Sequence, residues 1–159
     1  MKVFNLFDGE LDKRRDQEGF SWTARAVGPA IGGREIGASL YELEPGEKSF
    51  PYHYEFGAEE WLIVVTGTPT LREPGGEREL RPGDTVAFPE GPEGAHQVLN
   101  TGTSLLKYLC FSTMLEPDVA FYPDSEKLSV FQGGAPGTLE AKMTTIPAHA
   151  ECDYWEGEE

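Results

Sequence analysis

Proline and glycine recur along the whole chain and limit how long any regular element can be. The 159 residues include 19 Gly and 12 Pro, and the segments between them are short and rich in Val, Leu, Phe, Thr and Tyr. Such segments favour strands over helices. Turns with Pro-Gly pairs join several of them, at residues 44–47, 73–76 and 81–84. The pattern therefore predicts an all-β fold, a sandwich or a small barrel.

The expected strands lie mostly in the middle of the chain. They cover residues 36–43, 50–55, 60–66, 68–73, 77–80, 85–89, 96–99 and 104–112, with a further strand at 128–131. Residues 1–35 and 133–159 lose the strand pattern. The flanks, 1–35 and 114–159, are therefore expected to be irregular and to wrap the barrel or reach a second subunit. The length fits one domain, residues 1–159.

Charge and cysteine content restrict the partners and the compartment. The formal charge is −15, from 28 acidic and 13 basic residues, so phosphate backbones and anionic membranes would be repelled. We expect no nucleic-acid and no membrane partner. The sequence shows no secretory leader and no apolar span of membrane length, and Cys110 and Cys152 are too few for a disulfide framework. A cytoplasmic protein is expected.

The stretch YHYEFGAEEW, residues 52–61, gathers polar groups beside an apolar run. In a strand, His53 and Glu55 point to the same face because their spacing is two residues. Glu60 opens the next strand, and a hairpin would bring it beside them, whereas Glu59 points the other way. His96 opens a later strand. Imidazole and carboxylate groups suit divalent first-row metals, and two His with one Glu leave positions open for substrate.

Two motifs in this region resemble those of the cupin superfamily. The first is Gly46-x6-His53-x-Glu55-x4-Glu60-x6-Gly67, where cupins show G, HxH, E and G. The second is Gly83-x5-Pro89-x-Gly91-x4-His96-x3-Asn100, where cupins show G, PxG, H and N. The match covers about residues 36–113.

The resemblance implies a double-stranded β-helix, or jelly-roll barrel, and a metal held by His53, Glu60 and His96. Glu55 replaces the second histidine of HxH. If Glu55 also binds, the site has two histidines and two carboxylates and favours Mn²⁺ or Fe²⁺; otherwise it is a two-His-one-carboxylate triad. The acid could also have displaced the metal altogether. We take all four as ligands of a divalent ion (Fe, Mn, Zn or Ni). The segments YLCFSTMLEPD, FYPDSEK and DYWEGEE are similar to a little-characterised group of stand-alone bacterial cupins, which names no reaction.

Other candidate residues lie downstream. In the strand expected at 104–112, the charged Lys107 indicates that its face points outward, so Tyr108 and Cys110 are expected to point into the barrel. Both are candidate substrate-pocket residues, and Cys110 is alternatively a core-packing residue. His149 and Cys152 have too few neighbouring ligands for a zinc site and are read as incidental. Tyr154 and Trp155 are expected to anchor the acidic tail on the barrel or on a partner subunit.

Three functions remain open. The first is a dioxygenase-like oxidoreductase that acts on a small oxygenated molecule. The second is a metal-assisted isomerase or lyase of a sugar-like or carbonyl substrate, with Glu55 as the base if it is not a ligand. The third is a cupin that binds a small molecule without turnover. A homodimer is expected, because both ends of the chain offer edge-strand candidates.

Overall fold

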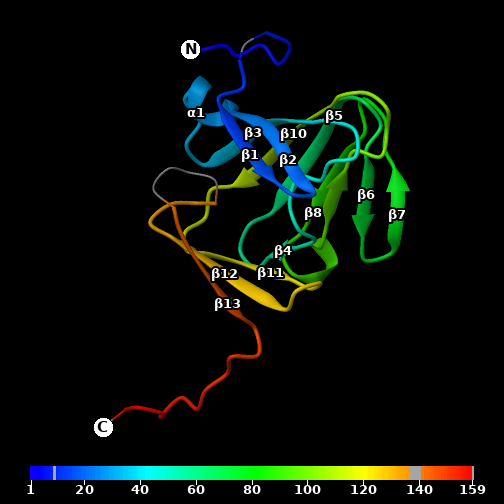
Figure 1. Cartoon of the computed structure of the whole chain (residues 1–159). Coiled ribbons are helices and arrows are strands. Elements are labelled where there is room, and N and C mark those ends of the chain that lie inside the picture. Colours follow the sequence, from blue (N-terminus) through cyan, green and yellow to red (C-terminus); the bar gives the residue numbers. More distant parts are fainter. Residues whose placement is uncertain (9, 137–140, 159) are drawn as a thin grey trace.

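In the part of the chain that the structure describes, nearly all the regular structure is β-strand, in three antiparallel sheets (Figure 1). The computed structural model describes residues 1–8, 10–136 and 141–158. The all-β prediction and the jelly-roll architecture are confirmed. Within the described residues, no helix has the length and apolar character that a membrane span requires.

The largest sheet has six strands in the spatial order β1-β2-β3-β10-β5-β8. Their bounds are β1 Lys13–Gln17, β2 Phe20–Ala26, β3 Ile36–Leu43, β10 Leu106–Thr113, β5 Glu60–Thr66 and β8 Thr85–Phe88. A short helix, α1 (Val27–Ile31), leads from β2 toward β3. The sequence places β3 and β5 at their observed bounds, because their apolar alternation is the clearest in the chain.

Two smaller sheets complete the fold and lie to the side of and below the large sheet in Figure 1. One has the order β13-β12-β11-β4, with β13 Lys142–Pro147, β12 Lys127–Gln132, β11 Asp118–Tyr122 and β4 Tyr54–Glu55. The other has the order β7-β6-β9, with β7 Gly76–Glu79, β6 Thr70–Glu73 and β9 Gln97–Leu99. A 3-10 turn, η1 (Pro92–Gly94), precedes β9.

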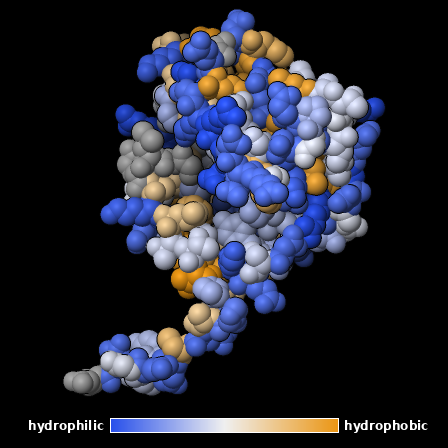
Figure 2. Space-filling view, in the orientation of Figure 1, coloured by the Kyte–Doolittle hydropathy of each residue, from blue (hydrophilic) through white to orange (hydrophobic). Residues whose placement is uncertain are grey.

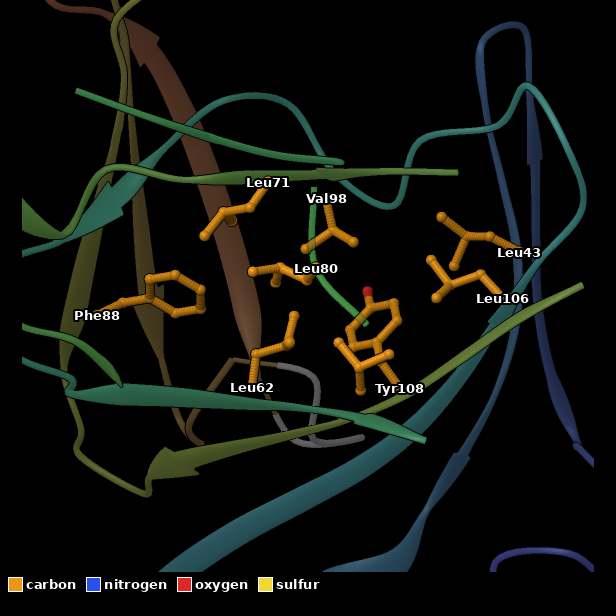
Figure 3. Packing of buried hydrophobic residues seen from close by; sticks show 9 residues of the cluster. Leu43, Leu62, Leu71, Leu80, Phe88, Val98, Leu106 and Tyr108 are labelled. Carbon is orange, nitrogen blue, oxygen red and sulfur yellow. The ribbon is translucent and has the colours of Figure 1, made fainter. Parts of the chain in front are cut away.

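The main core lies between these sheets, where alternate residues of several strands face one another (Figure 3). On β5 the inward side chains are Leu62 and Val64, each 1% exposed, while Trp61 points outward and is 48% exposed. The buried members of this cluster are Leu43, Leu62, Val64, Leu71, Leu80, Phe88, Val98, Leu106 and Tyr108. Burial of each large side chain contributes on the order of 1.5–3 kcal/mol.

A second, smaller cluster lies on the outer face of the large sheet. Val27, Leu40 and Leu109 are buried there, and Phe4, Leu6 and Leu11 of the N-terminal flank pack against them. Outward-facing positions of β3 and β10 are therefore also apolar. The N-terminal flank therefore packs on the barrel of its own chain, which is one of the two arrangements expected for it.

The flanks are more regular than the sequence indicates. Residues 1–35 contain β1, β2 and α1, and the C-terminal flank contains β11 and β13 besides the expected strand β12. The prediction of irregular flanks was wrong because β1 has the sequence KRRDQ, in which no apolar alternation marks a strand. It forms nevertheless, because its backbone pairs with β2 from Lys13↔Ala24 to Gln17↔Phe20.

Two other expectations need correction. The strand expected at 50–55 is reduced to β4, because Pro51 has no N–H to donate and His53 pairs only through an isolated bridge to His96. Tyr154 and Trp155 do not anchor the tail on the barrel of their own chain, since they are 82% and 71% exposed. The tail projects away from the body in Figures 1 and 2, and anchoring on a partner stays a prediction.

Candidate metal centre

The two predicted histidines lie next to each other, just outside regular strands. His53 precedes β4 and His96 precedes β9, and they form a two-way backbone bridge: the His53 N–H donates to the His96 carbonyl at 3.2 Å and the His96 N–H donates back at 2.8 Å. Their rings lie 4.8 Å apart between centroids. Residues 43 positions apart in the sequence are thereby held side by side.

Main-chain carbonyls fix the orientation of both imidazoles. His53 Nδ1 lies 2.8 Å from the Pro51 carbonyl oxygen, and His96 Nδ1 lies 2.9 Å from that of Gly94. A carbonyl only accepts, so each Nδ1 carries the proton and each Nε2 keeps its lone pair. This is the arrangement by which an outer partner orients a metal-binding histidine. Phe88 packs flat on His96, with ring centroids 3.7 Å apart.

Glu60 completes a three-ligand group. It is the first residue of β5, and its Oε2 lies 3.5 Å from His96 Nε2. One ligand atom from each of His53, Glu60 and His96 lies within 4.8 Å of the other two. The structure thus brings together the three residues that the motifs assign as ligands.

The electrostatics of the group suit a cation. Burial lowers the pKa of His53, and burial together with the neighbouring His53 lowers the pKa of His96 to about 3, so both rings are neutral at neutral pH. Burial raises the pKa of Glu60 to about 7, against the opposing effect of the Cys110 thiol. A buried carboxylate with neutral imidazoles lacks a positive partner, and a dication would supply one. The donor set therefore fits a divalent metal ion.

Glu55 lies beside this group but is not part of it. It is 7% exposed, and its Oε2 is buried with no hydrogen-bond partner among the described residues, as is Oδ2 of Asp118. Burial, Glu60 and Asp118, in that order, raise the pKa of Glu55 to about 9. A proton on Glu55 would allow one carboxyl group to donate to the other. Ligation by Glu55 stays a prediction, and the geometry favours a three-ligand site.

Tyr108 and Cys110 both face the interior, as the outward position of Lys107 indicates. Tyr108 is 2% exposed and stacks on Tyr41 at 5.2 Å, so it is part of the core. Cys110 is partly exposed, and its Sγ lies 3.8 Å from Glu60 Oε1. Their roles as substrate-pocket residues stay predictions, and Cys110 is the nearer of the two to the ligands.

Two residues near the centre come from the C-terminal flank and were missed as site residues. Tyr122 of β11 stacks on His53 with ring centroids 5.9 Å apart. Asp118 accepts hydrogen bonds from the backbone N–H groups of Gly57 and Val119 through Oδ1. The pairing of β11 with β4 brings both into the site. Asp118 and Tyr122 reach the site only through this long-range strand pairing, which the local sequence pattern does not predict.

Comparisons with known proteins agree with this geometry. A family model described as a cupin domain matches residues 39–112, the stretch that carries β5, most of β3 and β10, and all the candidate ligands. Residues 39–112 are thus similar to a cupin domain. A search of curated proteins gives no match.

Several solved structures resemble this chain. A putative sugar phosphate isomerase from Acidithiobacillus ferrooxidans ATCC 23270 is 27% identical, with 87% of this chain and 86% of that chain covered and a TM-score of 0.76. A sugar phosphate isomerase of the cupin superfamily from Silicibacter pomeroyi DSS-3 is 28% identical, with 80% and 76% covered and a TM-score of 0.70. The polyketide cyclase RemF from Streptomyces resistomycificus, at 21% identity, 71% and 79% coverage and a TM-score of 0.59, shows the fold alone.

Proposed function

We propose that this chain is a metal-dependent isomerase that interconverts the aldehyde and ketone forms of a small phosphorylated sugar. The observation that carries the proposal is the His53–Glu60–His96 group with a separate buried carboxyl, Glu55, next to it. Such a site combines a place for a cation with a group that can hold a proton. The names of two solved structures at 27% and 28% identity support the same reaction class.

The proposed reaction would use both a metal ion and side chains of the protein. A bound dication would supply a Lewis acid that polarises the substrate carbonyl. His53, His96 and Glu60 would hold it through two neutral Nε2 atoms and one carboxylate. Three protein ligands leave further positions for substrate oxygens.

Glu55 would move the proton. Aldehyde–ketone interconversion takes a proton from the carbon beside the carbonyl and returns one to the former carbonyl carbon, so no external oxidant or reductant is needed. The raised pKa of Glu55 makes its carboxylate a stronger base than an exposed one, and Asp118 lies beside it to hold its orientation. The cation would favour the ionised form of Glu55 that accepts the proton.

The test uses full-length protein loaded with Zn²⁺, which has no redox chemistry of its own. Aldose and ketose phosphates are incubated with it in D₂O, and conversion and deuterium incorporation are followed by NMR. We expect interconversion with deuterium at the carbon beside the carbonyl, reduced at least about 100-fold in Glu55→Gln, since general acid–base groups contribute 10²–10⁴-fold. Glu59→Gln is the matched control, because Glu59 is exposed and accepts from Trp61 Nε1 at 2.7 Å.

An oxidoreductase is the second candidate, and one observation favours it. Two histidines and one carboxylate with open positions are also the ligand set of non-haem iron oxygenases. Oxygen uptake by Fe²⁺-loaded protein on small phenols or diketones, without sugar interconversion by the Zn²⁺ form, would replace the isomerase proposal. Metal-free purified protein that binds small molecules without turnover would support a non-catalytic cupin.

A further inference from the structure

Arg15 lies on the inner side of the hairpin that the N-terminal flank adds to the large sheet. It pairs with Trp22 in the β1–β2 register, and directly opposed residues of antiparallel strands share a face. Trp22 packs against the main core cluster, so this face is the one that looks into the barrel. The neighbouring Arg14 lies on the opposite face and pairs with Asp16 at 3.0 Å.

A continuous aromatic wall joins Arg15 to the candidate metal centre. The Arg15 guanidinium carbon lies 5.9 Å from the centroid of the Trp22 ring. Trp22 contacts Phe50 at 5.6 Å between centroids, and Phe50 contacts His53 at 6.3 Å. Arg15 therefore stands at the outer end of a wall whose inner end is a candidate metal ligand.

A second aromatic ring lies at the inner end of this wall. Tyr122 of β11 stacks on His53 with ring centroids 5.9 Å apart, so His53 contacts the rings of both Tyr122 and Phe50.

Arg15 also differs in its partners from most of the other arginines. In a chain of net charge −15, Arg14, Arg25 and Arg72 each pair with an aspartate. Within the part of the chain that the structure describes, no carboxylate lies within ion-pair distance of Arg15. The Nε1 donor of the adjacent Trp22 is buried and likewise has no acceptor among the described residues. The Arg15 guanidinium and the Trp22 Nε1–H are thus neighbouring hydrogen-bond donors on the inner face of the hairpin.

We propose that Arg15 is a specificity-determining residue that binds the phosphate group of the substrate, while the carbonyl end lies at the metal centre. The proposal rests on the proposed function, of which it names the phosphate-binding residue. A guanidinium presents a planar fork of donors that matches phosphate oxygens, and a cation–π contact with Trp22 favours its position over that ring.

The test compares wild type, Arg15→Gln and the matched control Arg14→Gln, all as full-length metal-loaded protein. Titration calorimetry measures binding of ribose 5-phosphate and ribose, and of glucose 6-phosphate and glucose. We expect wild type and Arg14→Gln to prefer the phosphorylated sugar, and Arg15→Gln to lose about 10- to 100-fold of that preference, the factor one charged hydrogen-bonding partner is worth. Arg15→Lys should restore only part of it, because an ammonium lacks the fork.

The outcomes separate this inference from the isomerase proposal. The role of Arg15 would be overturned if wild type and Arg15→Gln preferred the phosphorylated sugar equally. It would also be overturned if Arg15→Gln and Arg14→Gln lost this preference equally, even if isomerisation is observed. An Arg15-dependent phosphate preference without any isomerisation would keep the phosphate site and reject the isomerase. Arg15 is exposed, so we expect both variants to unfold at the wild-type temperature, which a thermal melt checks.

Discussion

The candidate ligands His53 and His96 are oriented by the carbonyl groups of Pro51 and Gly94. Each carbonyl belongs to a residue only two positions before its histidine. The two loops that lead into β4 and β9 therefore determine both the tautomer and the direction of each ring. Glu60 differs, because its position at the start of β5 is set by the strand pairing Glu60↔Phe88.

Replacing Glu60 tests the site at the residue scale. We expect Glu60→Gln to lower affinity for Zn²⁺ or Mn²⁺ by more than about 100-fold, since loss of an outer-shell partner costs 10–100-fold and a ligand should cost more. Glu59→Gln is the control, since that neighbouring carboxylate points outward. Competition with a chromophoric chelator measures the affinity. Equal affinity in both variants would remove Glu60 from the site.

Glu55→Gln decides between the two ligand sets. With three ligands, we expect this variant to keep metal affinity within about 10-fold of wild type, because the buried Glu55 lies outside the ligand group. An amide also replaces a protonated carboxyl with little change in shape. A loss as large as that of Glu60→Gln would show that Glu55 is a fourth ligand. The same chelator competition measures it.

At the scale of elements, the turn before β9 is the most tightly packed point near the site. A Cβ on Gly94 would lie 1.8 Å from the Pro89 carbonyl oxygen, a backbone atom that cannot move without moving the loop. The carbonyl of Gly94 is also the group that orients His96. This explains a glycine at a position that the motif does not require.

Substitution of Gly94 should therefore affect stability and metal binding together. We expect Gly94→Ala to destabilise the protein by about 1–3 kcal/mol, the usual range for overpacking, and to weaken metal binding about 10-fold or more. Gly75→Ala is the control, because a Cβ there meets nothing within 4 Å. Urea unfolding and chelator competition give the two quantities. A metal affinity unchanged in Gly94→Ala would show that the loop does not position His96.

The sequence predicts some elements of the fold and of the candidate site but not others. Strands with clear apolar alternation, such as β3 and β5, were found at their bounds, and the motif spacing placed His53, Glu60 and His96 together. The charged strand β1 and the pairing of β11 with β4 could not be found in this way. Their positions depend on backbone hydrogen bonds to partner strands. The pattern of apolar and polar side chains does not predict those hydrogen bonds. Arg15, Asp118 and Tyr122 were missed for that reason.

For the whole molecule, the buried acids make stability depend on pH when no metal is bound. The pKa values of Glu55 and Glu60 are raised to about 9 and about 7, so the native state holds protons that the unfolded chain releases above its ordinary carboxyl pKa. Their contribution to stability is lost as pH rises through the native values. The lowered pKa of His96 acts in the opposite direction, but only below its ordinary value of about 6.5.

We therefore expect metal-free protein to lose stability between pH 6.5 and 8, by at most about 1.4 kcal/mol per pH unit for each proton released. Glu55→Gln should reduce this loss, because an amide has no proton to release. Urea unfolding in the presence of a chelator at four pH values measures it, with Glu59→Gln as control. An identical pH dependence in wild type and Glu55→Gln would contradict the assignment of a buried proton to Glu55.

The edge strand β1 has a consequence beyond substrate binding. A free sheet edge is a template on which a strand from another chain can add, and charged side chains are the common protection against such aggregation. With Lys13, Arg14, Arg15 and Asp16 in succession, β1 is a poor surface for strand addition. A variant that replaced all four with neutral residues would put solubility at risk as well as selectivity.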